Sequence, residues 1–209
     1  MTNVNAVLFD YGLVLSGPPD PAAWERLMAV LQAEEAGFHE AYWKHRRDYD
    51  RGALTAEAYW RTVAGDLKRS LDERQLERLV DVDTALWTRP NQPMIDWAAA
   101  LQRAGVKTGV LSNIGDRMET GVLARCGWLS DFAHVAFSHR LKMAKPDAAI
   151  YLHSAEGLGE ESAAILFIDD RKENVDAARG AGMQAIQYAD HEAFLVAMHD
   201  GGFGRLLDV

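Results

Sequence analysis

Four polar positions beside short apolar runs are the places where this sequence could do chemistry. They are Asp10, the pair Ser112-Asn113, Lys145, and the pair Asp169-Asp170. Carboxylates can act as nucleophiles or hold a divalent cation, and a lysine beside them offsets negative charge. Each residue alone has a structural explanation, because an aspartate after a strand often serves a turn. All four at the ends of strands are better explained as one functional site.

The elements that must position these residues are five short runs that we expect to form strands. The runs are Ala6–Phe9, Lys107–Leu111, Val135–Phe137, Ile165–Ile168 and Gln184–Tyr188. Several are almost entirely apolar, as is typical of parallel strands that are covered on both faces. Helical spacing of apolar residues over Met94–Ala104, Asp147–Leu158 and Lys172–Ala181 indicates βαβ units. The predicted fold is α/β, with a doubly wound, Rossmann-like parallel sheet that binds ligands beyond the carboxyl ends of its strands.

Residues 17–90 depart from this alternation and carry only helical signals. Asp20 before Pro21 has the pattern of a helix N-cap, and Thr55 is a second candidate cap. The stretch Ser70-Leu-Asp-Glu73 has the pattern of a capping box. A connection of this length is unusual within a compact domain. We therefore expect an inserted helical cap domain at 17–90.

The remaining segments, 1–16 and 91–209, are expected to form the α/β core domain. The formal net charge of −9 argues against nucleic acid as a partner, but it allows a small anionic substrate. No apolar run is long enough to span a membrane. The single cysteine, Cys126, is expected in the core, and its isolation fits a reducing compartment such as the cytoplasm. Nothing in the sequence indicates an oligomeric state.

The same polar positions resemble the four ordered motifs of the haloacid dehalogenase superfamily. The matching residues are Asp10-Tyr-Gly-Leu-Val14, Ser112, Lys145-Pro146 and Asp169-Asp170. The stretch Ile168-Asp-Asp-Arg-Lys-Glu-Asn174-Val-Asp-Ala-Ala-Arg-Gly-Ala-Gly182 is especially similar to the fourth motif. Within the superfamily, the chain looks most like sugar-phosphate phosphatases with an Asp-x-Gly-x-Val first motif. The resemblance implies Mg²⁺-dependent hydrolysis of a small phosphomonoester, with a phosphorylated metabolite such as a sugar phosphate as the substrate.

The resemblance also implies a nucleophile and a metal site. Asp10 would attack phosphorus and form an aspartyl-phosphate, which splits hydrolysis into two displacements. Mg²⁺ would be held by Asp10, the main-chain carbonyl of Gly12 and the acidic pair, with Asp170 the preferred direct ligand and Asp169 the second candidate.

Four further residues would support this chemistry by the same resemblance. Ser112 and Asn113 would bind phosphoryl oxygens at a helix N-terminus. Lys145 would be catalytic and would bind the phosphoryl group, offsetting its charge and that of the nucleophile. Pro146 indicates a helix start at Lys145. Asn174 would orient the acidic pair.

The sequence departs from the family pattern at the position of the proton donor. Many family phosphatases carry a second aspartate two residues after the nucleophile, where this chain has Gly12. Loss of general acid–base help costs about 10²–10⁴-fold in rate. Either another group replaces that aspartate, or the enzyme prefers leaving groups that need little protonation. The sequence alone favours the second outcome.

Two smaller departures lie near the motifs. Leu13 stands where glycine, asparagine or aspartate is usual, and Lys142 replaces a usual glycine. Lys142 is also a reserve candidate for the active lysine, although the Pro-Asp context favours Lys145.

The predicted cap holds the candidates for substrate contact. Tyr42, Trp43, Arg46 and Arg47 lie close together in the sequence. An aromatic stripe at helical spacing usually belongs to a core, but sugar rings pack on aromatic faces and an arginine can bind a second anionic group.

Two alternatives to phosphatase activity stay open. A 2-haloacid dehalogenase would use an aspartate nucleophile without a metal, whereas the acidic pair suits a cation. The missing aspartate at Gly12 also allows a catalytically weak protein that only binds a phosphorylated ligand. A mutase is less favoured, because returning the phosphoryl group would need the absent acid–base residue.

Overall fold

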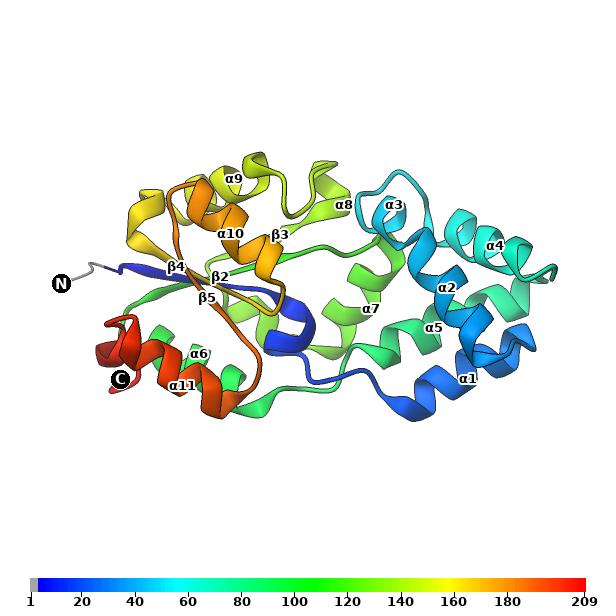
Figure 1. The fold of residues 1–209 in the computed structure, drawn as a ribbon, viewed down its shortest axis with the longest axis horizontal. Helices are drawn as coiled ribbons and strands as arrows, with labels where there is room; N and C mark the ends of the chain where they lie inside the picture. The colour runs from blue at the N-terminus through cyan, green and yellow to red at the C-terminus, as the bar shows by residue number, and fades with distance from the viewer. Residues whose placement is uncertain (1–3) are drawn as a thin grey trace.

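A computed structural model describes residues 4–209, and five parallel strands form its centre (Figure 1). The strands are β1 (Ala6–Phe9), β2 (Lys107–Ser112), β3 (His134–Phe137), β4 (Ile165–Asp169) and β5 (Gln184–Gln187). Their order is β3-β2-β1-β4-β5, so β1 lies between β2 and β4. All five predicted runs form strands, and the α/β parallel-sheet prediction is confirmed. Residues 1–3 of the predicted core segment lie outside the described residues.

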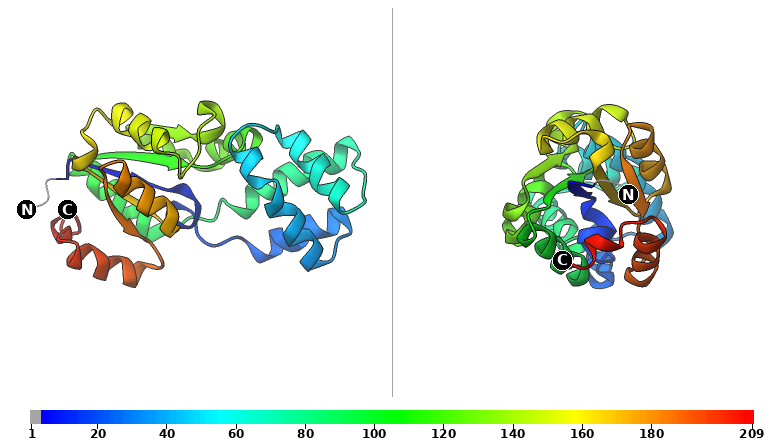
Figure 2. Two further views of the ribbon diagram at one scale, coloured as in Figure 1. Left: turned by 45° about the horizontal axis from the view of Figure 1, so that its top comes forward. Right: turned by 90° about the vertical axis from the view of Figure 1, so that its left-hand side faces the viewer.

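Helices cover both faces of the sheet, as near-continuous apolar strands require. The core helices are α6 (Gln92–Arg103), α7 (Asp116–Arg125), α8 (Ser138–Leu141), α9 (Ala148–Leu158), α10 (Lys172–Gly180) and α11 (His191–Asp200). Helices α9 and α10 lie on one face, and α6 and α11 lie on the other (Figures 1 and 2). Alternate residues of β1 pack against the two helix layers. Ala6 and Leu8 pack with α9 and α10. Val7 and Phe9 pack with α6 and α11. Short turns η1 (Tyr11–Leu15), η2 (Gly127–Asp131), η3 (Ser162–Ala164) and η4 (Gly204–Leu206) complete this part.

Five further helices gather beyond one end of the sheet (Figure 1). They are α1 (Pro21–Leu31), α2 (Glu35–Lys44), α3 (Arg46–Asp50), α4 (Ala56–Asp66) and α5 (Glu73–Leu86). These helices share a hydrophobic core of their own, in which Leu27, Phe38 and Trp60 are fully buried. A separate core supports the predicted cap domain, although its boundaries at 17 and 90 stay a prediction.

Helix caps account for several element starts, with two corrections to the sequence analysis. Asp20 caps α1 and Thr55 caps α4 through their side chains, as predicted. The capping box predicted at Ser70 is wrong: Asp72 and Gln75 form it, so α5 begins at Glu73. The helix predicted to start at Lys145 begins three residues later, at Ala148.

The two chain segments that join the helical insert to the sheet region run side by side. Ser16 lies opposite Pro90 in an antiparallel bridge, and the Gly17 N–H donates to the Arg89 carbonyl at 2.7 Å. Asn91 extends this pairing, because its side-chain amide donates to the Val14 carbonyl at 2.7 Å. Among residues 4–209, no helix has the length and apolar character needed to cross a membrane.

Candidate active site

Asp10 lies directly after β1, at the centre of the carboxyl edge of the sheet. Its Oδ1 accepts hydrogen bonds from the Tyr11 N–H and from the Lys145 ammonium, both at 2.7 Å. Within the described chain, Oδ2 has no hydrogen-bond partner. The residue is buried, so burial raises the pKa of the Asp10 carboxyl well above its usual range, with Asp169 and Asp170 adding to this and Lys145 opposing it.

Lys145 forms ion pairs with Asp10, which follows β1, and with Asp169, the last residue of β4. Its Nζ lies 2.7 Å from Asp10 Oδ1 and 2.7 Å from Asp169 Oδ2, with the side chain almost completely buried. Burial alone would lower the pKa of Lys145, but the two carboxylates raise it above its usual value. The lysine therefore stays charged between them. Lys142, the reserve candidate, is exposed and donates instead to the Gly52 carbonyl.

The acidic pair after β4 divides into a fixed and a free carboxylate. Asp169 is fully buried and accepts hydrogen bonds from Lys145, the Arg171 N–H and the Asn174 amide. Burial opposes its ionisation, but these donors hold the pKa of Asp169 below its usual value. Asp170 is partly exposed, and burial and Asp169 raise its pKa. Asn174 therefore orients Asp169 alone and not the pair.

Asp10, Asp169 and Asp170 converge on one point. Each offers a carboxylate oxygen, and these oxygens all lie within 4.8 Å of one another. Among the described residues, the Lys145 ammonium contacts Asp10 and Asp169, so one paired positive charge stands against three carboxyl groups. The cluster's donor set of carboxylate oxygens is the kind that Mg²⁺ prefers.

Ser112 and Asn113 lie at the end of β2 but have different surroundings. Ser112 is buried at the cavity, and among residues 4–209 its hydroxyl has no hydrogen-bond partner. The Asn113 side chain, in contrast, makes two 2.9 Å hydrogen bonds to the backbone of Lys145. The Asn113 amide group therefore holds Lys145 in place, and only its backbone N–H is left for the predicted phosphate contact.

A cavity of about 580 Å³ connects these residues with the helical insert. The core side contributes Asp10, Gly12, Ser112, Lys145 and Asp170 to its wall. The insert contributes Trp43, Arg46, Arg47, Asp50 and Trp87. The cavity therefore has a charged floor, an aromatic wall and charged groups from both parts of the chain.

Two of the four predicted cap candidates are not free to meet a substrate. Tyr42 is fully buried, does not line the cavity, and donates a 2.7 Å hydrogen bond to Asp83, so the structure places its side chain away from the cavity. Arg46 reaches the wall, but it is buried against Tyr42 and paired with Asp50 at 3.0 Å and Asp83 at 3.3 Å. Its charge is already balanced within the insert.

Trp43 and Arg47 are the available candidates. Trp43 is 44% exposed and lines the cavity. Arg47 is exposed, also lines the cavity and has no ion-pair partner among residues 4–209.

The sequence analysis missed several residues of the cavity wall. Asp50, Trp87 and Met118 come from α3, the end of α5 and α7, and Arg171 and Glu173 follow the acidic pair. No local pattern marks Asp50 or Trp87, because each depends on helices that meet only in the folded insert.

The two unusual residues near the motifs occupy left-handed backbone. Leu13 has φ of 59° and Lys142 has φ of 56°. This conformation favours glycine and asparagine, and holding another residue there costs on the order of 1 kcal/mol or more. The residue preferences expected from the resemblance therefore have a conformational cause.

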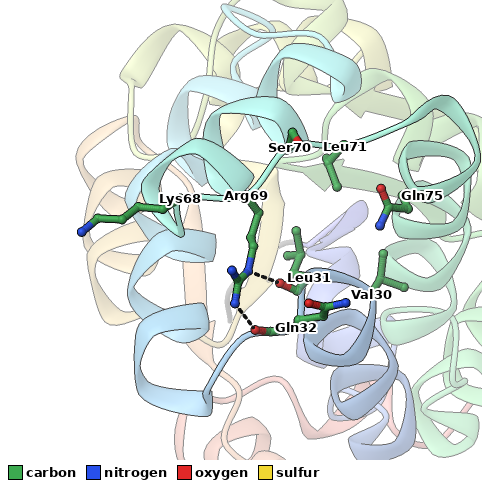
Figure 3. Close-up of a pocket in the computed structure, with 8 residues that line it drawn as sticks. All are labelled: Val30, Leu31, Gln32, Lys68, Arg69, Ser70, Leu71 and Gln75. Atoms are coloured by element: carbon green, nitrogen blue, oxygen red, sulfur yellow. Dashed lines mark hydrogen bonds between the residues drawn. The ribbon is translucent and has the colours of Figure 1, made fainter.

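A second hollow, of about 310 Å³, lies between the end of α1 and the α4–α5 connection (Figure 3). Its lining contains no aspartate, glutamate, histidine or cysteine. Arg69 donates there to the carbonyls of Leu31 and Gln32, as the dashed lines in Figure 3 mark. This hollow therefore lacks the carboxylate cluster that the first cavity holds.

Comparison with known proteins gives a family match over most of the chain. The family described as haloacid dehalogenase-like hydrolase matches residues 4–182. The chain is 39% identical over 189 residues to the Mycobacterium tuberculosis protein Phosphatase MT3486, covering 88% of this chain and 86% of that protein. It is 26% identical over 193 residues to N-acetylmuramic acid 6-phosphate phosphatase from Pseudomonas aeruginosa, covering 88% and 82%.

The fold has a matching solved structure as well. The HAD family enzyme bt-2542 from Bacteroides thetaiotaomicron, in complex with magnesium and inorganic phosphate, superposes with a TM-score of 0.73 at 19% identity. The superposition covers 92% of this chain and 98% of the other.

Proposed function

The chain belongs to the haloacid dehalogenase-like hydrolases, and from that premise we propose that it hydrolyses a small phosphomonoester with Asp10 as the nucleophile. The observation that carries this proposal is the convergence of Asp10, Asp169 and Asp170 within 4.8 Å of one another, with the Lys145 ammonium in contact with Asp10 and Asp169. The phosphatase relatives and the magnesium and phosphate complex of the structural neighbour support it.

Asp10 has a suitable position for covalent chemistry. Its Oδ1 is held by Lys145 and the Tyr11 N–H, which leaves Oδ2 to attack phosphorus and give an aspartyl-phosphate. The Ser112 hydroxyl has no hydrogen-bond partner among residues 4–209, and at the cavity it would donate to a phosphoryl oxygen. Lys145 places a positive charge where the transferring group gathers negative charge.

The donor set fits Mg²⁺. Asp10, Asp170 and the carbonyl of Gly12 would hold the ion, because Asp169 is already engaged by Lys145 and Asn174. Bound Mg²⁺ supplies the positive charge that offsets repulsion between the nucleophile and a phosphate dianion. Asp169 would not contact the ion directly and would instead hold Lys145 in place.

The wall of the cavity favours a compact substrate with a polar, ring-shaped body. Trp43 offers an aromatic face for a sugar ring, and Arg47 offers a cation for a second anionic group. A sugar phosphate is the substrate class that suits both. The 17–90 cap would close over it from the insert side.

The test is a screen of phosphorylated metabolites with Mg²⁺, comparing wild type with Asp10→Asn. We expect sustained phosphate release by wild type, loss of release with EDTA, and none by the nearly isosteric variant. Turnover of a 2-chloro acid that resists EDTA would instead establish a dehalogenase. Tight binding of a phosphate ester without phosphate release would establish a binding protein. Either result would overturn the proposal.

A further inference from the structure

Asp50 is a carboxylate that the catalytic roles above leave unused. It is the last residue of α3 in the helical insert, yet it lines the same cavity as Asp10. Arg46 Nε donates to its Oδ1 at 3.0 Å. Within the part of the chain that the structure describes, Oδ2 has no hydrogen-bond partner. The side chain is 15% exposed, so one oxygen is fixed and the other is available at the cavity.

The backbone around Asp50 is fastened to the core rather than to the insert alone. The Ser138 hydroxyl donates to the Asp50 carbonyl and accepts at 2.9 Å from the Ile114 N–H, just beyond β2. Arg51 forms an ion pair with Asp147, and Lys142 Nζ donates to the Gly52 carbonyl at 2.7 Å. These contacts hold residues 50–52 against the edge of the sheet that carries the catalytic groups.

The charges around Asp50 suit a group that gives and takes a proton near neutral pH. Burial raises its pKa to about 6, while Arg46 lowers it, Asp83 from α5 raises it and Lys145 from the core lowers it. Lys145, which contacts Asp10, lines the same cavity as Asp50 and lowers the pKa of its carboxyl. General acids and bases work best when their pKa lies near the working pH.

We propose that Asp50 is the general acid and base of the reaction, in place of the aspartate that the chain lacks at Gly12. This role rests on the proposed function. As Asp10 Oδ2 bonds to phosphorus and the ester P–O bond breaks, the Asp50 carboxyl gives its proton to the leaving oxygen. Asp50 then takes a proton from water as the water oxygen attacks phosphorus. The bond between phosphorus and Asp10 breaks, inorganic phosphate leaves, and both carboxyl groups return to their starting states.

The experiment follows the first turnover with Mg²⁺ as release of alcohol from p-nitrophenyl phosphate, phenyl phosphate and an alkyl phosphate. In the wild type we expect the rate of alcohol release to depend only weakly on leaving-group pKa, because a donated proton assists the poor leaving groups. In Asp50→Asn the alkyl ester should slow by about 10²–10⁴-fold and p-nitrophenyl phosphate far less. The variant should also release p-nitrophenol in a burst, since attack by water has lost its base.

Asp83→Asn is the matched control. Asp83 is the other buried carboxylate that pairs with Arg46, but it does not line the cavity. Its variant should keep the wild-type leaving-group dependence. A steep dependence in the wild type would overturn the proposal without any variant. The proposal would also be overturned if Asp50→Asn kept the wild-type dependence of rate on leaving-group pKa. The same change in this dependence in Asp83→Asn would overturn it too, because the change would then come from Arg46. Failure of the wild type to release phosphate from any ester would instead overturn the phosphatase assignment itself.

Discussion

Replacement of Lys145 by methionine tests the electrostatic centre of the site. The change keeps most of the side-chain stem but removes the ammonium that lies 2.7 Å from both Asp10 and Asp169. Removing one partner of a buried ion pair leaves the other charge uncompensated, at a cost of about 3–5 kcal/mol. Because Lys145 and Asp169 are almost completely buried, we expect Lys145→Met to lower the free energy of unfolding by that amount at pH 7.

The loss should depend on pH with a defined sign. Without the ammonium, the pKa values of Asp10 and Asp169 rise in the folded state. The folded variant then binds more protons than the unfolded chain above the usual carboxyl pKa, so its stability falls as pH rises. The deficit relative to wild type should therefore be smaller at pH 5 than at pH 7.

Urea unfolding in EDTA measures the effect, with Lys142→Met as the matched control. Lys142 is exposed and, in the part of the chain that the structure describes, bonds only the Gly52 carbonyl, so its variant should stay within about 0.5–1 kcal/mol of wild type. Adding Asp10→Asn to Lys145→Met should recover at least about 1 kcal/mol, because the two residues are in contact. A loss below about 1 kcal/mol, or strict additivity of the two changes, would refute the coupled cluster.

Three further predictions address other parts of the site. Mg²⁺ at a concentration of 100 times its dissociation constant should stabilise the wild type against unfolding by about 2.7 kcal/mol and so raise its unfolding temperature. Asp170→Asn should weaken this response in a calorimetric titration. Arg47→Ala should raise KM by about tenfold, with kcat nearly unchanged, only for substrates with a second anionic group. Between pH 4 and pH 7, Asp50→Asn should gain about 2 kcal/mol of stability relative to wild type, because the folded pKa of Asp50 is raised to about 6 and ionising it costs stability; equal pH dependence in urea unfolding would contradict this.

The central sheet was predictable because its strands are buried on both faces and read as apolar runs. The same logic predicted that Asp10, Ser112 and the acidic pair would meet, since carboxyl ends of parallel strands share one edge. Asn174 was predicted near the acidic pair, and it bonds Asp169. Each of these predictions needed only local sequence information, namely the place of a residue within or beside one strand.

The helical insert was less predictable because polar residues there face inward. Tyr42 and Arg46 were candidates for substrate contact, but both lie in a buried network with Asp83. Asp83 lies in α5, far along the sequence, and no local pattern connects it to α3. The role of the Asn113 side chain was not predictable for the same reason, since its partner Lys145 is 32 residues away.

The proposed replacement for the aspartate missing at Gly12 is a residue that a sequence motif cannot detect. A motif compares residues at fixed spacing, so the loss of an acid two residues after the nucleophile looks like the loss of acid–base catalysis. A side chain from the insert can line the same cavity, because Ser138 and Asp147 hold residues 50 and 51 at the edge of the sheet. If Asp50 serves there, neither the sheet nor the insert holds a complete site. Proton transfer would then occur only while the two parts are in contact, which couples catalysis to their closure.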